Sequence, residues 1–140
     1  MKTSVILDTG PFVALLNGRD EYHAWTVETL KNVATPMLTC ESVISEAVFL
    51  LRGSGGGLGA IARILRDGAI RITHSLALES ELKRVRELLV AYRDLPISLA
   101  DACLVRMSEN HPRHKVLTLD NHFRVYRRAD NKPIPLLIPN

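Results

Sequence analysis

Four acidic residues stand where a carboxylate could do chemistry. Asp8 directly follows the apolar run Val5–Leu7, and Asp120 ends a second short apolar run, "VLTLD". Glu46 and Asp101 lie in strongly apolar helical patterns, where burying a lone carboxylate is costly. If the four converge without basic partners they repel one another. The group that best stabilises such a cluster is a hard divalent cation, Mg²⁺ or Mn²⁺, since oxygen-only ligands select these ions over zinc.

Three of these carboxylates also have a purely structural explanation. Asp8 could cap a helix beginning at "TGPF", where Thr and Pro suit the first turn. Asp101 could form a capping box with Ser98, three residues before it. Glu46 could lie on the exposed strip of a half-buried helix. For each residue taken alone, the structural and the chemical interpretations both remain open.

Asp120 differs because its neighbour could replace it as a helix cap. Asn121 is as good a cap for the following segment "HFRVYRR" as an aspartate would be. We therefore expect Asn121 to cap that segment and Asp120 to be left free to face a metal ion.

Apolar runs alternate with helical patterns along the chain, which predicts an α/β fold with a parallel sheet between helices in three α/β/α layers. A strand order of 3-2-1-4-5 would place Asp8 and Asp120 side by side, where the order reverses and ligands commonly bind. The expected strands are Val5–Leu7, Met37–Cys40, Ile70–Thr73, Val116–Leu119 and Pro135–Ile138. The expected helices cover residues 10–17, 21–34, 41–52, 57–68, 76–94 and 98–110.

Two of the helical segments carry further signals. Gly68 is a suitable stop for the fourth helix. The fifth helix is expected to turn a single apolar stripe inward, consisting of Leu78, Leu82, Val85, Leu89 and Tyr92. The glycine-rich stretch 52–60 follows a helix rather than a strand and lacks Gly-Lys-Ser/Thr. It is therefore interpreted as a flexible connection between helices, not as a nucleotide-binding loop.

Composition limits the remaining possibilities. The chain has 140 residues, which suits one domain, and 46% of them are hydrophobic, which suffices for a core. No apolar run approaches the length of a membrane span, and the N-terminus does not resemble a signal peptide. Cys40 and Cys103 are expected to be free and buried, and the protein cytoplasmic. The net charge of +3 permits an anionic partner, although on charge alone a solvated surface is the favoured explanation.

Four segments together resemble a known family. In order, "ILDTGPF", "ISEAVFLLR", "LPISLADACLV" and "TLDNHF" are similar to motifs of the PIN-domain ribonucleases, in particular the VapC-type toxins of prokaryotic toxin–antitoxin pairs. Each motif alone is weak, whereas the ordered set is specific and spans essentially the whole chain. The resemblance implies a single PIN-like domain over residues 1–140. Gly10 departs from the pattern, since many relatives have Ser, Asn or Ala there.

The resemblance implies two sets of site residues, and the charge around the crevice suggests a third. The acidic metal-binding and catalytic positions are Asp8, Glu46, Asp101 and Asp120. The supporting positions beside them are Thr9, Ser98, Asn121 and His122. The candidates for contacts with RNA phosphates are Arg19, Arg52 and Arg124.

The implied activity is hydrolysis of RNA phosphodiester bonds with Mg²⁺ or Mn²⁺ as cofactor, leaving a 5′-phosphate and a 3′-hydroxyl. The metal would lower the pKa of a bound water, which Asp101 or Glu46 would orient. The implied partners are RNA, a second copy of the chain in a homodimer, and a small antitoxin. An arginine from the antitoxin's tail would suit the acidic crevice.

Three other functions remain possible on the sequence alone. The chain could be a PIN-domain nuclease of RNA processing or turnover without an antitoxin, or a non-catalytic RNA-binding module. A haloacid-dehalogenase-like phosphatase would use Asp8 as its nucleophile. That chemistry usually needs a second Asp two residues later, where this chain has Gly10.

Overall fold

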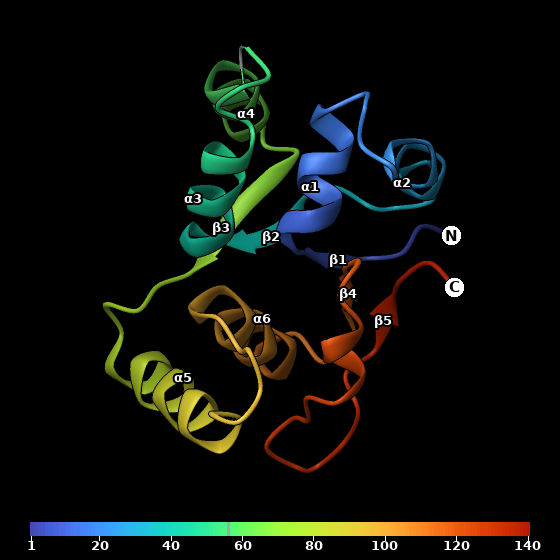
Figure 1. The fold of residues 1–140 in the computed structure, drawn as a ribbon. Helices are drawn as coiled ribbons and strands as arrows, with labels where there is room; N and C mark the ends of the chain where they lie inside the picture. The colour runs from blue at the N-terminus through green and yellow to red at the C-terminus, as the bar shows by residue number, and fades with distance from the viewer. Residues whose placement is uncertain (56) are drawn as a thin grey trace.

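Five short parallel strands form the centre of the molecule. The computed structural model describes residues 1–55 and 57–140. All the strands pair in parallel in the order β3-β2-β1-β4-β5, so the predicted sheet and strand order are confirmed (Figure 1). The strands are β1 (Val5–Leu7), β2 (Met37–Cys40), β3 (Ile70–His74), β4 (Lys115–Leu117) and β5 (Leu136–Leu137).

Helices cover both faces of this sheet, which confirms the predicted α/β class. The helices are α1 (Thr9–Leu16), α2 (His23–Leu30), α3 (Glu41–Leu50), α4 (Gly57–Asp67), α5 (Glu79–Ala91) and α6 (Leu99–Asn110). Helices α1 to α4 lie on one side and α5 and α6 on the other (Figure 1). From β1 the chain adds β2 and then β3 toward one edge of the sheet. It then returns to the centre and adds β4 and β5 on the other side of β1. Right-handed crossovers therefore place the two groups of helices on opposite faces.

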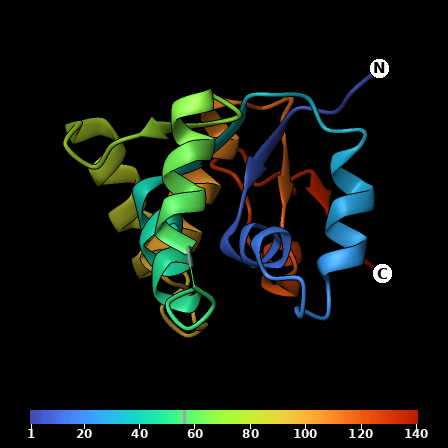
Figure 2. The ribbon, with the colours of Figure 1, turned by 90° about the horizontal axis from the view of Figure 1, so that it is seen from above.

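The central strands are apolar and covered on both faces. Every residue of β1 and β2 is buried, and neither strand alternates apolar with polar residues: β1 is aliphatic throughout, and β2 is apolar except for Thr39, whose hydroxyl donates to the carbonyl of Leu7. β1 and β4 lie side by side in the middle of the sheet (Figure 2). Cys40 and Cys103 are free and buried, as expected. Among the described residues, no helix is long and apolar enough to cross a membrane.

Several element boundaries differ from the prediction for local reasons. Helix α2 ends at Leu30 rather than residue 34 because the next three N–H groups bond to carbonyls only three residues back. The chain then forms an isolated bridge between Val33 and Thr3. Gly68 has a φ of +79°, a conformation that favours glycine, and it ends α4 as predicted. The glycine-rich stretch does connect α3 to α4, but it includes residue 56, which lies outside the described residues, and its flexibility stays a prediction.

The apolar stripe predicted for α5 is partly wrong. Leu82 is 52% exposed, while Leu88, outside the predicted stripe, is 1% exposed and lies in the core with Val85. The second exposed member of the stripe is Leu78. Leu89 and Tyr92 pack partly buried against the core, as expected.

Ion pairs between α5 and α6 accompany this difference between the predicted and the observed inward face of α5. Arg84 donates from Nη2 to Oε2 of Glu109 at 2.8 Å, and Arg106 donates to Glu81. These pairs hold the polar edge of α5 against α6, so the helix faces inward with Val85 and Leu88 rather than with Leu82.

Truncating the buried leucine of α5 should cost far more stability than truncating the exposed one. We expect Leu88→Ala to lower the free energy of unfolding by about 2–5 kcal/mol, because it leaves a cavity in the core. Leu78→Ala, at the exposed start of α5, is the matched control and should cost less than about 1 kcal/mol. Urea denaturation measures both variants, and equal losses would contradict the observed orientation of α5.

Candidate active site

Asp8 occupies the centre of the candidate site, immediately after β1. Its carboxylate is buried, with 7% of the residue exposed. Oδ1 accepts the N–H of Thr9 at 2.7 Å, which caps α1, and Oδ2 accepts the hydroxyl of Thr118 at 2.6 Å. The structural interpretation of Asp8 as a helix cap is thus confirmed, and the same side chain also interacts with the charges of Asp101 and Asp120.

Burial raises the pKa of Asp8 from its ordinary value of 3.8 to about 6. The hydrogen bonds from Thr118 and Thr9 lower the pKa, but by less than burial raises it, and the charges of Asp101 and Asp120 raise it further. Ionised Asp8 is therefore stabilised only partly by the protein itself, and a bound cation would complete its neutralisation.

Thr118 joins Asp8 to Asp120 and was missed by sequence reasoning. Its hydroxyl donates to Asp8 and accepts the backbone N–H of Asp120 at 3.0 Å. β4 was expected to reach Leu119 but ends at Leu117, so Asp120 follows the strand after two intervening residues. The sequence shows only a lone hydroxyl within the apolar run "VLTLD", and its burial and its partner Asp8 become visible only in the fold.

The expected division of roles between Asp120 and Asn121 is wrong. Asp120 itself caps the 3-10 helix η1 (Asn121–Arg124), since its Oδ1 accepts the N–H of His122 at 2.8 Å. Asp120 has the extended backbone that lets an aspartate reach the N–H two residues later, whereas Asn121 is already inside η1. Oδ1 of Asn121 instead accepts a hydrogen bond from Arg124 at 3.0 Å.

Asp101 lies in the first turn of α6 and forms the predicted capping box. Its Oδ2 accepts the N–H of Ser98 at 3.0 Å, while Oγ of Ser98 accepts the N–H of Asp101 at 3.0 Å. Burial raises the pKa of Asp101, the hydrogen bond from Ser98 lowers it, and the charges of Asp120 and Glu46 raise it. Asp101 thus caps α6 and also interacts with the other carboxylates.

Glu46 reaches the site from the exposed side of α3. The residue is exposed, as its structural interpretation predicted, yet its Oε2 accepts the hydroxyl of Thr9 at 2.9 Å. Thr9 therefore links two carboxylates, because its N–H binds Asp8 and its hydroxyl binds Glu46. Thr9 thus lies beside two of the carboxylates, and its supporting role at a metal site stays a prediction.

The four carboxylates lack strong cationic partners. Among the described residues, none of them forms an ion pair with Lys or Arg, and Asp120 alone has a titratable partner, Nδ1 of His122 at 2.8 Å. In the part of the chain that the structure describes, no three His, Cys, Asp or Glu side chains stand close enough together to hold a metal ion between them. An open set of carboxylate oxygens still fits Mg²⁺ or Mn²⁺, because Mg²⁺ usually keeps several waters and few protein ligands.

Tyr126 is a second residue that sequence reasoning missed. It is fully buried, and its ring packs edge-on against Phe123 and Tyr92, with ring centroids 5.2 and 5.1 Å away. Within the described chain its hydroxyl has no hydrogen-bond partner. Burial raises the pKa of Tyr126, and the charges of Asp101 and Asp120 raise it further. A protonated hydroxyl, able to donate, therefore lies near the carboxylates.

The three arginines expected to contact RNA lie around the site rather than in it. Arg124 belongs to η1, directly beyond Asp120. Arg52 follows α3, and its Nη1 donates to the carbonyl of Phe49 at 2.6 Å. Arg19 lines a hollow between the end of α1 and residues 53–54. Their contact with RNA stays a prediction.

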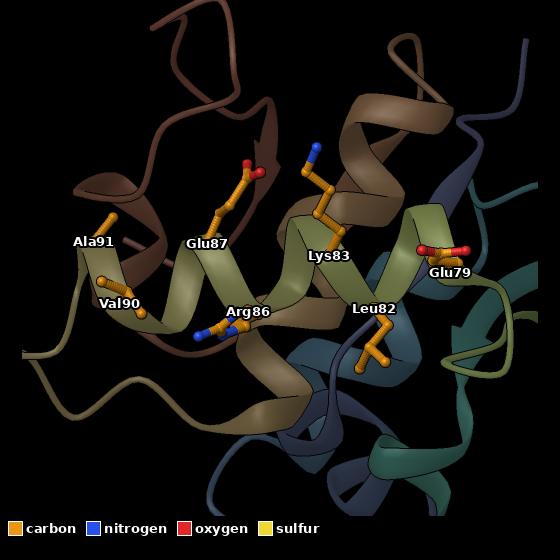
Figure 3. Close-up of a pocket in the computed structure, with 7 residues that line it drawn as sticks. All are labelled: Glu79, Leu82, Lys83, Arg86, Glu87, Val90 and Ala91. Atoms are coloured by element: carbon orange, nitrogen blue, oxygen red, sulfur yellow. The ribbon is translucent and has the colours of Figure 1, made fainter.

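Two cavities have different relations to the carboxylates. One of 570 Å³ lies along the outer face of α5, away from the acidic residues (Figure 3). Its lining combines apolar and charged side chains, namely Glu79, Leu82, Lys83, Arg86, Glu87, Val90 and Ala91. The other, of 420 Å³, includes Glu46 and is lined by Ser45, Glu46, Phe49 and Leu50. Only the second adjoins the candidate site.

Replacing Asp8 should stabilise the metal-free protein at neutral pH. The folded chain keeps a proton on Asp8 up to about pH 6, whereas the unfolded chain loses it near pH 3.8. Stability therefore falls as the pH rises through this window, and the full penalty is present above it. We expect Asp8→Asn in EDTA at about pH 8 to raise the free energy of unfolding by about 1–3 kcal/mol.

The same comparison at about pH 4 should show little difference, because Asp8 is then largely protonated in the folded wild-type protein. Thermal and urea unfolding measure the effect at both pH values. Asp94→Asn, at an exposed position, is the matched control and should have no such effect. An Asp8→Asn variant less stable than wild type at both pH values would contradict this account of the buried carboxylate.

Comparisons with known proteins identify the family and the fold. The family model for the PIN domain matches residues 5–129. Over 127 residues the chain is 26% identical to ribonuclease VapC26 of Mycobacterium tuberculosis, covering 88% of this chain and 92% of that protein. The crystal structure of M. tuberculosis VapC20, described as a sarcin-ricin loop cleaving toxin, superimposes with a TM-score of 0.74 at 22% identity.

The VapC20 match covers 84% of this chain and 91% of that one, and at this identity it shows the shared fold. The family match extends over most of the chain, from β1 through η1, and so includes all four acidic residues. The resemblance read from the four acidic segments is thereby confirmed. The chain belongs to the PIN domain family.

Proposed function

We propose that the protein is an endoribonuclease that hydrolyses RNA phosphodiester bonds with Mg²⁺ or Mn²⁺. The observation that carries this proposal is the buried carboxylate of Asp8, which interacts with the charges of Asp101 and Asp120 and has no Lys or Arg partner among the described residues. The similarity to a relative named ribonuclease VapC26 supports RNA as the substrate.

Each carboxylate has a defined part in this proposal. Asp8, Asp101, Asp120 and Glu46 would hold the metal, which when bound lowers the pKa of a water and offsets charge on the scissile phosphate. Thr118 and Thr9 fix the orientation of Asp8, and Ser98 fixes that of Asp101. Asp101 or Glu46 would orient the attacking water, since both border the crevice. Hydrolysis would leave a 5′-phosphate and a 3′-hydroxyl.

Basic side chains around the crevice would contact the RNA backbone. Arg124 lies in η1 beside Asp120, and Arg52 lies just beyond α3, which carries Glu46. Arg19 is at the end of α1. Such contacts position the strand without reading its sequence.

We propose further that the protein is the toxin of a toxin–antitoxin pair acting in the cytoplasm, where RNA and a newly made antitoxin would meet. The support is the similarity to VapC26 over most of both chains. A small antitoxin would place an arginine in the acidic crevice, where unpaired carboxylates favour a guanidinium. A nuclease of RNA processing without an antitoxin is the alternative. The phosphatase is disfavoured because a Cβ on Gly10 would lie 3.1 Å from Cδ1 of Leu119, leaving little room for a second aspartate.

A homodimer is also part of the proposal, and the outer face of α5 supports it. Leu82 and Val90 are exposed there on either side of Arg86, and the opposite charges of Lys83 and Glu87 lie along the other edge of the helix (Figure 3). Two copies of α5 packed antiparallel about a two-fold axis would bury these apolar side chains and pair the charges. An exposed apolar face rimmed by charge is typical of a protein interface.

Cleavage of RNA by the purified protein tests the main proposal. We expect cleavage with Mg²⁺ or Mn²⁺ and none with EDTA. Asp8→Asn combined with Asp101→Asn should lower the rate by about 100-fold or more, because two of the metal-holding carboxylates are lost. Asp94→Asn, at an exposed position, should keep the wild-type rate. Metal-dependent cleavage that survives in the double variant would show that the site has been wrongly assigned.

The mass of the protein in solution tests the dimer. We expect light scattering to give twice the mass of one chain for wild type, and one chain for Leu82→Glu, because paired α5 faces would bring two new carboxylates together. Leu58→Glu, at an exposed leucine of α4, is the control and should stay dimeric. A Leu82→Glu variant that remains a dimer would exclude the α5 face as the interface.

A further inference from the structure

Phe49 differs from the other phenylalanines of the chain. Phe12 and Phe123 are fully buried, whereas Phe49 is 60% exposed near the end of α3. Aromatic residues make up only 5% of this chain, and the exposed ring of Phe49 offers a flat apolar surface on which a planar group can stack. The ring of Phe49 is therefore a candidate for contact with a ligand.

The cavity lined by Phe49 shares one residue, Glu46, with the acidic site. It has a volume of 420 Å³ and includes Glu46, one helical turn before Phe49. Glu46 also accepts the hydroxyl of Thr9 at 2.9 Å, and its charge acts on Asp101. A molecule bound in this cavity would thus lie directly beside a phosphate held at the carboxylates.

Arg52 adds a flat cation to the aromatic ring. Its guanidinium carbon is 3.9 Å from the centroid of Phe49, and its Nη1 donates to the carbonyl of Phe49 at 2.6 Å. Nucleobases stack on aromatic rings and on guanidinium planes alike, and the remaining donors of an arginine suit a phosphate oxygen. The ring of Phe49 can therefore stack on the base of a nucleotide, and the guanidinium of Arg52 can bind a phosphate.

We propose that this cavity binds an unpaired nucleobase of the RNA, stacked against Phe49 beside the phosphate at the acidic site, with Arg52 on a neighbouring phosphate. The inference rests on the proposed ribonuclease function and adds a base-binding subsite to it. The guanidinium of Arg52 over the Phe49 ring favours an anionic nucleotide over an apolar protein segment, because an apolar partner would leave that charge without an anion. Stacking of this kind tolerates any base.

Binding of RNA with and without bases tests the proposal. The probes are a labelled single-stranded oligoribonucleotide of about 12 nucleotides and a backbone of equal length lacking bases, both in Ca²⁺ so that binding is measured apart from cleavage. Wild type should prefer the probe with bases. We expect Phe49→Leu to weaken binding of that probe by roughly 5- to 100-fold and to leave binding of the abasic backbone unchanged. Phe49→Trp should restore the preference.

Leu78→Ala, at an exposed apolar position on the other side of the sheet, is the matched control and should keep the wild-type preference. Equal affinities of wild type and Phe49→Leu for the RNA probe would overturn the proposal. So would a Phe49→Leu variant that loses its partner subunit while binding RNA normally, because the surface would then be a protein interface. If wild type cleaves no RNA, the proposed function fails. If it cleaves RNA while Phe49→Leu changes no affinity, only the subsite fails.

Discussion

The structure depends on a carboxylate buried at the end of the central strand. Asp8 follows β1, which has strands on both sides and helices on both faces, so its charge has little access to water. Two threonines stabilise this charge, one from the start of α1 and one from the segment after β4, but burial still dominates and raises the pKa of Asp8. The carboxylates of Asp101 and Asp120 add repulsion. Without a bound cation, the burial and mutual repulsion of these carboxylates raise the free energy of the folded protein. A bound cation offsets this cost.

Helix capping and metal chemistry are not alternatives at this site. Asp8, Asp101 and Asp120 each cap the helix that they begin or precede, and these hydrogen bonds fix where each carboxylate points. Among the contacts of the described residues, Asp101 uses only Oδ2 for its cap and Asp120 uses only Oδ1. Each therefore leaves its second carboxylate oxygen for another ligand. The caps that make each aspartate look structural in the sequence therefore also preorganise the group, which lowers the cost of binding a metal ion.

The sequence predicts most of the fold and only part of the site, for physical reasons. Strands and their order follow from buried aliphatic runs that alternate with helical patterns, which are local signals. The inward face of α5 was mispredicted because Leu82 and Leu88 are equally apolar, and ion pairs with α6 decide which of them is buried. The roles of Thr118 and Tyr126 depend on contacts across the fold. The bond from Thr118 to Asp8 joins residues 110 positions apart, and no local pattern reveals it. Asn121 failed as a cap because η1 begins one residue earlier than the pattern suggested.

The central claim is that the four carboxylates act as one metal site, and titration with Mn²⁺ by calorimetry tests it most directly. Wild type should bind Mn²⁺ and release protons near pH 6, where Asp8 is half protonated in the metal-free protein. Asp8→Asn should weaken the binding by about tenfold or more and remove most of the proton release. Mn²⁺ affinity and proton release that are the same in wild type and Asp8→Asn would contradict the claim.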